Sequence, residues 1–339
     1  MPTLPPAAPG VEPLMTRGHL ALEESDWDAA SGFFDSALNL DAQYAPAYMG
    51  KLLAELQIRS EAQLGTLSFP ISDRRNFQLA VRFADAAYKT KLEGYDVEIK
   101  KRIGDAGGGR KVLTINGVEY AFRWCPSGTF QMGSPRDEAA RYDDETQHQV
   151  TLSRGFWMLE TVVTQEMWEK VMGNNPSNFK GANLPVERVS WDDSQEYIKK
   201  LNDLKIAPAG FKFSLPTEAQ WEYACRAGTT TAYHFGNTLT QQQANFGGNQ
   251  TRDVGSYPAN AWGLRDMHGN VWEWCADWFG DYPSGAVTDP TGAERGSVRV
   301  IRGGSWYNLA EDCRSALRGR HDPSYRSSDI GLRLSLVSQ

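Results

Sequence analysis

The sequence has few cysteines, and none of them is spaced as a metal-binding or redox pair. The 339 residues contain four, Cys125, Cys225, Cys275 and Cys313, and no two form a C-x-x-C motif. This spacing argues against a zinc ribbon and against a thioredoxin-like dithiol. Isolated cysteines are most often small buried side chains, and we expect the same here.

An excess of positive charge and long apolar runs are also absent. With 35 Lys and Arg against 42 Asp and Glu, the formal net charge is -7, which disfavours a general nucleic-acid partner. No apolar run approaches the roughly 18 residues that span a bilayer, so we expect no membrane insertion. The first ten residues lack the basic and apolar parts of an export signal. This favours a cytoplasmic location, with display at a cell or virion surface as the alternative.

Residues 12–103 contain little Gly or Trp and follow a helical period. The residues at three- and four-residue steps are Gly18, Ala21, Trp27, Ala30, Phe34, Ala37 and Leu38. This pattern resembles one thirty-four-residue tetratricopeptide repeat, and residues 45–56 and 74–92 predict further helices. We therefore expect a small tetratricopeptide-like helical domain that tethers or presents the rest of the chain, or that itself acts as an adaptor. Residues 104–110 have the composition of a flexible linker.

The remaining residues, 111–339, alternate short apolar segments with Gly, Pro, Asn and Asp. Asn116-Gly117 between two alternating runs predicts a hairpin with a type I′ turn. Thr164, Ser190 and Thr217 are expected to cap three helices. With the helical first part, this predicts an α+β protein of two domains.

Six segments of this second part identify it with a known family. They are Pro126–Ser134, Glu160–Trp168, Leu184–Trp191, Leu215–Gly228, Gly263–Trp274 and Arg299–Trp306. In this order they resemble the formylglycine-generating-enzyme (sulfatase-modifying factor) domain, a branch of the C-type lectin fold. The resemblance covers roughly residues 111 to 335 and implies that fold for them.

The family contains both enzymes and binding proteins, so function depends on the site. The oxidase branch uses two Cys, five residues apart near the C-terminus, that bind copper as thiolates. Here Cys313 has no such partner, because Arg318 stands five residues on. The ergothioneine-type iron branch needs a His triad from a helical domain, and the first part of this chain offers only His19. We therefore expect no copper and no catalysis, with a metal-dependent oxidase as the alternative.

The C-terminal segment resembles a third branch, the variable proteins of diversity-generating retroelements. In these proteins a Gly-Gly-Ser-Trp strand precedes a variable stretch, and a Gly-Phe-Arg-Leu-like strand follows it. The matching stretch here is 307–329. The retroelement mutates adenines, so varied positions never become Met, Trp, Gln, Lys or Glu, and only Glu311 in the stretch belongs to that set.

The positions expected to vary alternate with positions expected to be fixed. The fixed ones are Ala310, Cys313–Ala316, Arg318, Pro323, Arg326 and Ile330–Arg333. The expected ligand-binding positions are Tyr307, Asn308, Leu309, Asp312, Leu317, Gly319, Arg320, His321, Asp322, Ser324, Tyr325, Ser327, Ser328 and Asp329. Stiff aromatic side chains among short polar ones are also typical of antibody loops. We expect a binding scaffold whose partner is a protein or glycan.

The segment from Asp266 to Glu273 resembles the calcium loop of the family. The resemblance implies ligation of a structural Ca²⁺ by the side chains of Asp266 and Glu273 and by the carbonyls of Gly269 and Val271, a set of the oxygen ligands that calcium prefers. The alternative is a turn held by hydrogen bonds alone. His268 within this loop is expected to be a hydrogen-bonded structural residue. The acidic residues at 137–138 and 143–145 are expected to form a solvated loop.

Overall fold

The computed structural model describes residues 8–67, 71, 74–106 and 109–338. The chain divides into two compact units, Met1–Ile103 and Gly104–Gln339. Among the described residues, no helix combines the length and the apolar character needed to cross a bilayer.

The first unit is helical throughout its described part. Its elements are α1 (Val11–Glu23), α2 (Trp27–Leu40), α3 (Ala45–Glu55), the 3-10 helix η1 (Glu61–Thr66), α4 (Arg75–Phe83) and α5 (Ala86–Ala106). Phe34 of α2 is fully buried between Gly18 of α1 and Gly50 of α3. A Cβ atom at either glycine would lie 2.5 Å from the Phe34 ring, so the absence of a side chain lets the three helices approach one another. Helices occur where the period predicts them, whereas the tetratricopeptide assignment stays a prediction.

Two details of this unit differ from the expectation. The helix predicted over 74–92 is interrupted, because Ala84 is extended and the Asp85 carboxylate accepts a hydrogen bond from Tyr88 N at 2.7 Å, which caps a new helix. The flexible linker expected at 104–110 is wrong at both ends. Helix α5 continues to Ala106 and a strand begins at Arg110; residues 107–108 lie outside the described residues.

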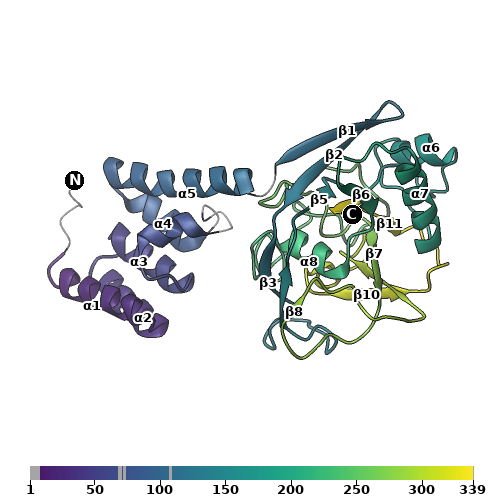
Figure 1. The fold of residues 1–339 in the computed structure, drawn as a ribbon. Coiled ribbons are helices and arrows are strands. Elements are labelled where there is room, and N and C mark those ends of the chain that lie inside the picture. The colour runs from purple at the N-terminus through teal and green to yellow at the C-terminus, as the bar shows by residue number, and fades with distance from the viewer. Residues whose placement is uncertain (1–7, 68–70, 72–73, 107–108, 339) are drawn as a thin grey trace. The chain divides into compact units, whose positions relative to one another are not determined.

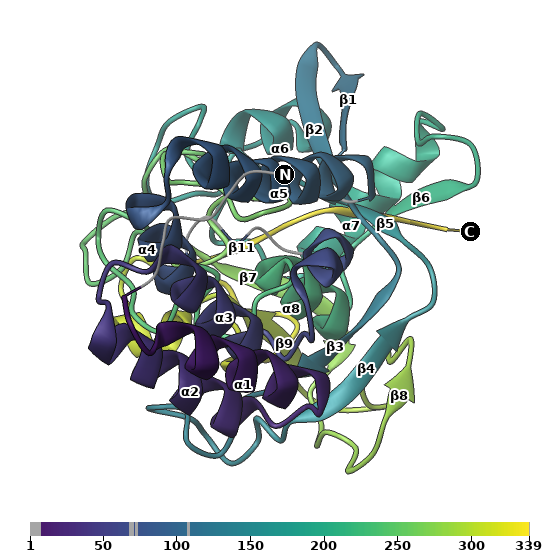
Figure 2. The ribbon, with the colours of Figure 1, turned by 90° about the vertical axis from the view of Figure 1, so that its left-hand side faces the viewer.

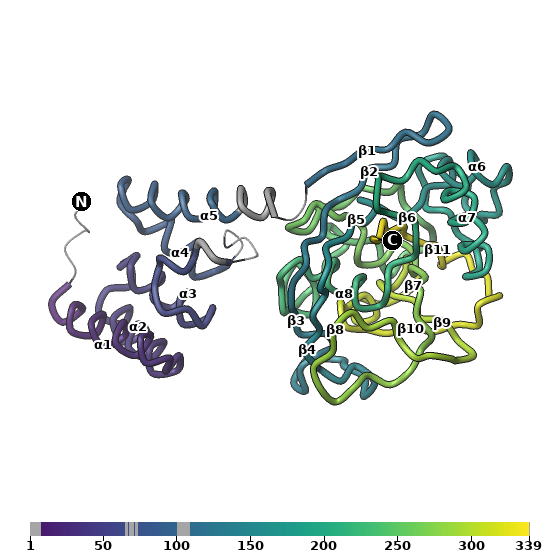
Figure 3. The backbone as a smooth tube through the Cα atoms, viewed as in Figure 1, coloured from purple at the N-terminus to yellow at the C-terminus, as the bar shows by residue number. Residues whose placement is uncertain are grey.

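The second unit begins with the predicted hairpin of β1 (Arg110–Ile115) and β2 (Val118–Cys125). Ile115 pairs with Val118, and the turn residues Asn116 and Gly117 have φ of 49° and 85°, which confirms the type I′ turn. The hairpin belongs to a sheet in the order β1-β2-β5-β12-β6, completed by β5 (Phe156–Leu159), β12 (Ser335–Ser338) and β6 (Phe211–Ser214). The last strand thus lies inside the sheet, and Figure 3 shows the C-terminal end among β5 and β6.

The other strands of this unit form two further sheets. One has the order β10-β9-β7-β11, formed by β10 (Arg318–His321), β9 (Arg299–Arg302), β7 (Trp272–Trp278) and β11 (Ile330–Leu332). The other joins β3 (Gly128–Met132), β4 (His148–Leu152) and β8 (Val287–Thr288), which lie together in Figure 2. The expected variable stretch therefore leaves β9, passes through β10 and ends at β11.

Three α-helices and one short 3-10 helix complete the second unit. Thr164, Ser190 and Thr217 cap α6 (Gln165–Met172), α7 (Trp191–Asp203) and α8 (Glu218–Arg226), as predicted. The 3-10 helix is η2 (Ala310–Cys313). Helices α6 and α7 lie side by side (Figure 1), and the rings of Trp168 and Tyr197 stack at 4.9 Å between them. The unit mixes helix and sheet with much ordered loop, in agreement with the predicted class.

The packing around Phe34 predicts that Gly→Ala substitutions at two positions of the first unit have opposite effects on stability. Gly50→Ala should lower the free energy of unfolding by about 1–3 kcal/mol, because the new methyl group overlaps the Phe34 ring. Gly32→Ala on α2 is the matched control: a Cβ there meets nothing within 4 Å, and the change should stabilise by about 0.5–1 kcal/mol. Urea denaturation followed by far-UV circular dichroism measures both. Equal effects of the two substitutions would contradict this packing.

Candidate functional site

The loops of residues 305–313 and 321–329 are held in place through backbone atoms. The indole nitrogen of Trp306 donates to the carbonyl of Ser328 at 3.1 Å, so the two loops are joined to each other. Gly247 N donates to Asn308 O at 2.8 Å, and Arg188 N donates to Ser327 O at 3.0 Å. Apart from the indole, these bonds use atoms that every non-proline residue has, so the loop path does not depend on most of its side chains.

Side-chain exposure differs between the positions expected to vary and the positions expected to be fixed. Tyr307, Leu309 and Tyr325 are 71%, 62% and 43% exposed, so these large side chains are accessible to a partner. Other candidate positions are exposed (Arg320, Asp322, Ser324) or half-buried (Asn308, Asp312, Gly319, His321, Ser327, Ser328, Asp329). By contrast, Cys313–Ala316, Arg318 and Ile330–Arg333, all expected to be fixed, are buried, whereas Ala310 and Pro323 are half-buried and Arg326 is exposed.

Leu317 and Gly319 do not belong to a displayed surface. Leu317 is only 5% exposed and lies in the main hydrophobic core of the unit with Ile301 and Trp272. Gly319 pairs with Ile301 in the sheet, and a Cβ atom there would lie 2.6 Å from Cγ1 of Ile301. Both predictions are wrong for the same reason: this part of the stretch is strand or leads directly into it, and its inner face packs against β9 and β7.

Three polar residues among the expected ligand-binding positions form hydrogen bonds within the loops. The Ser305 hydroxyl lies 2.6 Å from Oδ1 of Asn308 and 3.3 Å from Oδ2 of Asp329. The Asp312 carboxylate accepts a hydrogen bond from Leu309 N at 3.0 Å and so supports η2. Substitution at these positions therefore affects the loop as well as any ligand.

The distal end of the stretch presents an aromatic pair and a cation. The rings of His321 and Tyr325 stack at 4.2 Å with an interplanar angle of 13°. Burial lowers the pKa of His321, which favours the neutral ring in this stack. The Arg320 guanidinium lies over the Phe279 ring at 4.5 Å.

The position at which the oxidase branch would place a second thiolate is filled by an ion pair. The Arg318 guanidinium donates two hydrogen bonds to the Glu218 carboxylate, at 2.7 and 2.9 Å, in a buried environment. The Cys313 side chain is fully buried, and burial raises the pKa of its thiol, which keeps it protonated. All four cysteines are buried and free, as predicted.

Part of the acidic segment is not solvated. Arg314 of the variable stretch binds Glu138 and Glu145, each at 2.7 Å, and Glu145 has no exposed side-chain area. The expectation of a solvated loop is therefore wrong for these two residues. The partners stand 169 or more positions apart from Arg314, so no local pattern could reveal the pairing.

His268 is the structural residue that the sequence predicts. Its Nε2 accepts a hydrogen bond from His234 N at 3.2 Å, so Nδ1 carries the proton and donates to Cys313 O at 2.7 Å. Burial lowers the pKa of His268 to about 4. The His234 ring stacks on it at 4.8 Å, and both His234 ring nitrogens are buried without a hydrogen-bond partner. Within the described ranges, no three His, Cys, Asp or Glu side chains are arranged to hold a metal ion.

The expected calcium ligands are near one another in sequence but not equally available. Both Glu273 oxygens are engaged: Arg333 donates to them at 2.7 and 2.9 Å, and the Trp221 indole donates to Oε2 at 2.7 Å. The Asp266 carboxylate accepts Gly255 N at 2.6 Å through Oδ2, while its buried Oδ1 has no partner. Burial raises the pKa of Asp266 to about 6. Glu273 thus does not fit a calcium ligand, and ligation by Asp266, Gly269 and Val271 stays a prediction.

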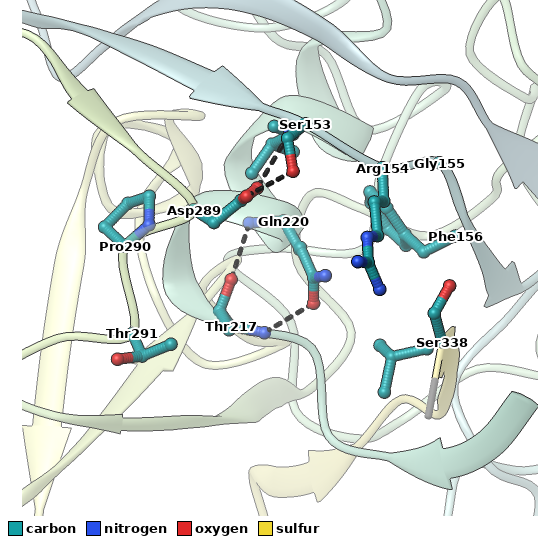
Figure 4. Close-up of a pocket in the computed structure, with 12 residues that line it drawn as sticks. Ser153, Arg154, Gly155, Phe156, Thr217, Gln220, Asp289, Pro290, Thr291 and Ser338 are labelled. Atoms are coloured by element: carbon teal, nitrogen blue, oxygen red, sulfur yellow. Dashed lines mark hydrogen bonds between the residues drawn. The ribbon is translucent and has the colours of Figure 1, made fainter.

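Of two hollows in the second unit, one borders the candidate site. One, of about 170 Å³, lies between Ser153–Phe156, the start of α8 and Asp289–Thr291 (Figure 4), and no candidate residue lines it. In Figure 4 the Arg154 side chain extends toward Ser338. The other, of about 720 Å³, borders the variable stretch at Ala310 and Glu311. The stretch therefore borders this hollow through Ala310, Glu311 and Arg314.

Comparison with known proteins matches residues 120–336 to the model of the sulfatase-modifying factor enzyme 1-like domain. The chain is 35% identical over 188 residues to a formylglycine-generating enzyme of Streptomyces coelicolor, covering 49% of this chain and 57% of that protein. It is 45% identical over 157 residues to the serine/threonine-protein kinase pkn1 of Chlamydia caviae, covering 45% of this chain and only 24% of the kinase. Thus the chain spans about a quarter to just over half of the length of these curated relatives.

Among solved structures, Treponema denticola variable protein 1 is similar to this chain. The TM-score is 0.60 at 32% sequence identity, over 67% of this chain and 98% of the other. The formylglycine-generating-enzyme-like C-type lectin fold, suspected from the motifs, is therefore shown for the second unit.

The buried Arg318–Glu218 pair predicts a large cost for its loss. Arg318→Met should lower the free energy of unfolding by about 3–5 kcal/mol, because it leaves a buried carboxylate without its main partner. Arg320→Met, two residues along the same strand, removes a solvent-exposed guanidinium 3.7 Å from Asp144 and should cost about 0–1 kcal/mol. Urea denaturation of both variants compares them, and similar costs would refute the structural role of Arg318.

The burial of His234 predicts that the protein loses stability in acid. Burial holds the pKa of His234 well below its ordinary value of 6.5, so below pH 6.5 the unfolded chain gains a proton that the folded chain does not. The contribution of the neutral His234 ring to the free energy of unfolding is complete above pH 6.5. Below that pH it falls by about 1.4 kcal/mol per pH unit. His234→Phe should therefore gain stability relative to the parent as the pH drops from 6.5 to 5. Unfolding free energies across this range measure the gain, and a constant difference would exclude it.

Proposed function

The chain belongs to the sulfatase-modifying factor enzyme 1-like domain family, and on this basis we propose that it is a non-catalytic binding scaffold of that family. The exposed side chains within residues 307–329 would contact the ligand, and the stretch would be diversified as in a retroelement variable protein.

One observation carries this proposal, namely the separation of exposed and buried positions within a single short stretch. Residues expected to be fixed supply the core and the ion pairs, as Cys313, Arg314 and Arg318 do. Side chains expected to vary, led by Tyr307 and Leu309, reach solvent from loops anchored through the backbone. Residues on such loops can change without dismantling the core. The likeness to Treponema denticola variable protein 1 supports the same function.

The chemistry of the displayed side chains favours a protein or glycan surface as partner. Tyr307 and Tyr325 offer broad, stiff area at small cost in conformational entropy, and Arg320, Asp322 and Ser324 offer adaptable polar contacts. The most exposed side chains stand out from the surface, so they suit an extended partner better than an enclosed small molecule.

The first unit would present this surface. The packing of α1, α2 and α3 through Phe34 supports a tetratricopeptide-like arrangement, for which the chain shows one repeat. Because peptide grooves of this kind ordinarily need three or more stacked repeats, a spacer is favoured over a second binding domain.

An oxidase is the second candidate, and the identity to a formylglycine-generating enzyme favours it. That chemistry would require a metal site different from two thiolates five residues apart. The protonated, buried Cys313 and the paired Arg318 argue against such a site.

Two leucines test the proposed separation of exposed and buried side chains within residues 307–329. Leu309→Ala should change the free energy of unfolding by no more than about 0.5 kcal/mol, because its side chain is largely in solvent. Leu317→Ala removes the same atoms from the core and should cost about 2–5 kcal/mol. Tyr307→Ala should behave like Leu309→Ala. Chemical denaturation decides, and a cost above about 2 kcal/mol at Leu309 or Tyr307 would show that these side chains support the fold instead of a ligand.

The diversification part of the proposal has a genomic test. An adenine-rich near-copy of the segment that encodes residues 307–329 should lie beside a reverse transcriptase gene. The DNA around the gene answers this directly, and the lack of such a copy would remove diversification while leaving the binding scaffold to the substitution test.

A further inference from the structure

One hollow of the second unit is lined by two opposite charges that do not pair with each other. It is the hollow of about 170 Å³ in Figure 4, which lies between the β4–β5 loop, the start of α8 and the loop after β8. Arg154 and Asp289 both line it. Within the described ranges, Arg154 has no hydrogen-bond or ion-pair partner, and Asp289 has no cationic partner.

The Asp289 carboxylate is held in place by neutral donors only. Its backbone N donates to Thr151 O at 2.8 Å. Oδ1 accepts a hydrogen bond from the Ser153 backbone N at 2.8 Å, and Oδ2 accepts one from the Ser153 hydroxyl. Each carboxylate oxygen has a second lone pair, so both oxygens can accept a further bond. The carboxylate is therefore oriented by the chain and still able to bind a cationic donor.

Arg154 and Gln220 offer unused donors to the same hollow. Arg154 is exposed, and none of its N–H groups has an acceptor among the residues that the structure describes. In the view of Figure 4, Gln220 lies between Asp289 and Arg154. Oε1 of Gln220 accepts Thr217 N at 3.0 Å in the capping box of α8, which fixes the amide group. Its Nε2 makes no hydrogen bond in the described part of the chain and can donate to a ligand.

The larger hollow beside the variable stretch does not share this property. The arginine that lines it, Arg314, is already paired with Glu138 and Glu145. Its guanidinium group is therefore committed to the fold, whereas that of Arg154 is not.

The size and the walls of the hollow suit a small molecule. An apolar cavity of about 150 Å³ holds one benzene molecule, so about 170 Å³ can hold a molecule the size of alanine or serine. Leu152 and Phe156, which are buried, and Val337, which is half-buried, supply apolar contact for a short side chain.

Two opposite charges that face one hollow without pairing match a ligand that carries both charges. A free amino acid does so at pH 7, because its α-carboxyl group is ionised and its α-amino group is protonated. The fork of a guanidinium group matches the two oxygens of a carboxylate, and an ammonium group donates to carboxylate oxygens. A simple anion would be repelled by Asp289 and a simple cation by Arg154.

We propose that this hollow binds a free α-amino acid with a small side chain, with the ligand carboxylate on Arg154 and the ligand ammonium group on Asp289. Gln220 donates to the same carboxylate. None of the lining residues lies within 307–329. The site is thus separate from the proposed displayed surface, and its test does not depend on whether that surface binds a partner.

Isothermal titration of the full chain at pH 7 with L-alanine and with L-serine tests the site. At least one of them should bind saturably. Propionate lacks the ammonium group and ethylamine lacks the carboxylate, so each should bind at least about tenfold more weakly, which corresponds to about 1.4 kcal/mol. Absence of saturable binding of both amino acids below about 10 mM overturns the proposal. Equally tight binding of propionate or ethylamine also overturns it, because a plain anion or cation site would explain that result.

Substitution of the two charged residues gives a sign test that a purely structural role would fail. Arg154→Gln should weaken amino-acid binding about tenfold but tighten ethylamine binding, because it removes both a carboxylate partner and a charge that repels cations. Asp289→Asn should weaken amino-acid binding by a similar factor but tighten propionate binding. The asparagine amide can keep both hydrogen bonds to Ser153.

Arg295→Gln is the control, since Arg295 is an exposed arginine of the same unit that does not line the hollow, and this variant should bind as the parent does. Thermal melts by circular dichroism establish that each variant is folded. If Asp289→Asn does not fold, Arg154→Gln decides. Equal amino-acid binding by Arg154→Gln and the parent, or weaker binding of amino acid and ethylamine alike, contradicts the proposed site.

Discussion

Buried pairs of arginine and glutamate are the interaction on which the second unit depends. Arg318 binds Glu218 across 100 residues of sequence, Arg314 binds Glu145 across 169, and Arg333 binds Glu273 across 60. Each pair has both charges out of water, so neither partner can be lost without leaving an unpaired buried charge. In a fold with so much loop, these pairs and the tryptophan-rich core fix where β10 and β11 begin.

This constraint explains how the proposed variable surface could coexist with a rigid fold. The variable stretch contributes Arg314 and Arg318 to the framework, and its flanking strand contributes Arg333. Between these anchors the backbone is already placed, and side chains such as Tyr307 and Leu309 are left with little structural role. The same framework fills the position that copper chemistry would need, since Arg318 is committed to Glu218. Arg318 thus supplies a buried ion pair at the position where the oxidase branch would have its second thiolate.

The sequence could predict the features that depend on residues close to one another in the chain. The type I′ turn at Asn116-Gly117 and the caps of α6, α7 and α8 depend on residues within a few positions of one another, and all were found as predicted. The alternation of positions expected to be fixed with positions expected to vary also located most of the exposed side chains within residues 307–329. Leu317 was misplaced because only the sheet shows that its side chain faces the core. The ion pairs of Arg314, Arg318 and Arg333 were missed, because each joins segments that only the tertiary fold brings together.

The central claim is that this chain binds a ligand through exposed loops and does not perform the copper chemistry of its oxidase relatives. Titration of the reduced protein with Cu(I), with Cys313→Ala as control, tests it most directly. The buried and protonated Cys313 thiol, with no partner thiolate, predicts no stoichiometric copper binding and no difference between the two proteins. One equivalent of tightly bound copper that disappears in Cys313→Ala would contradict the account.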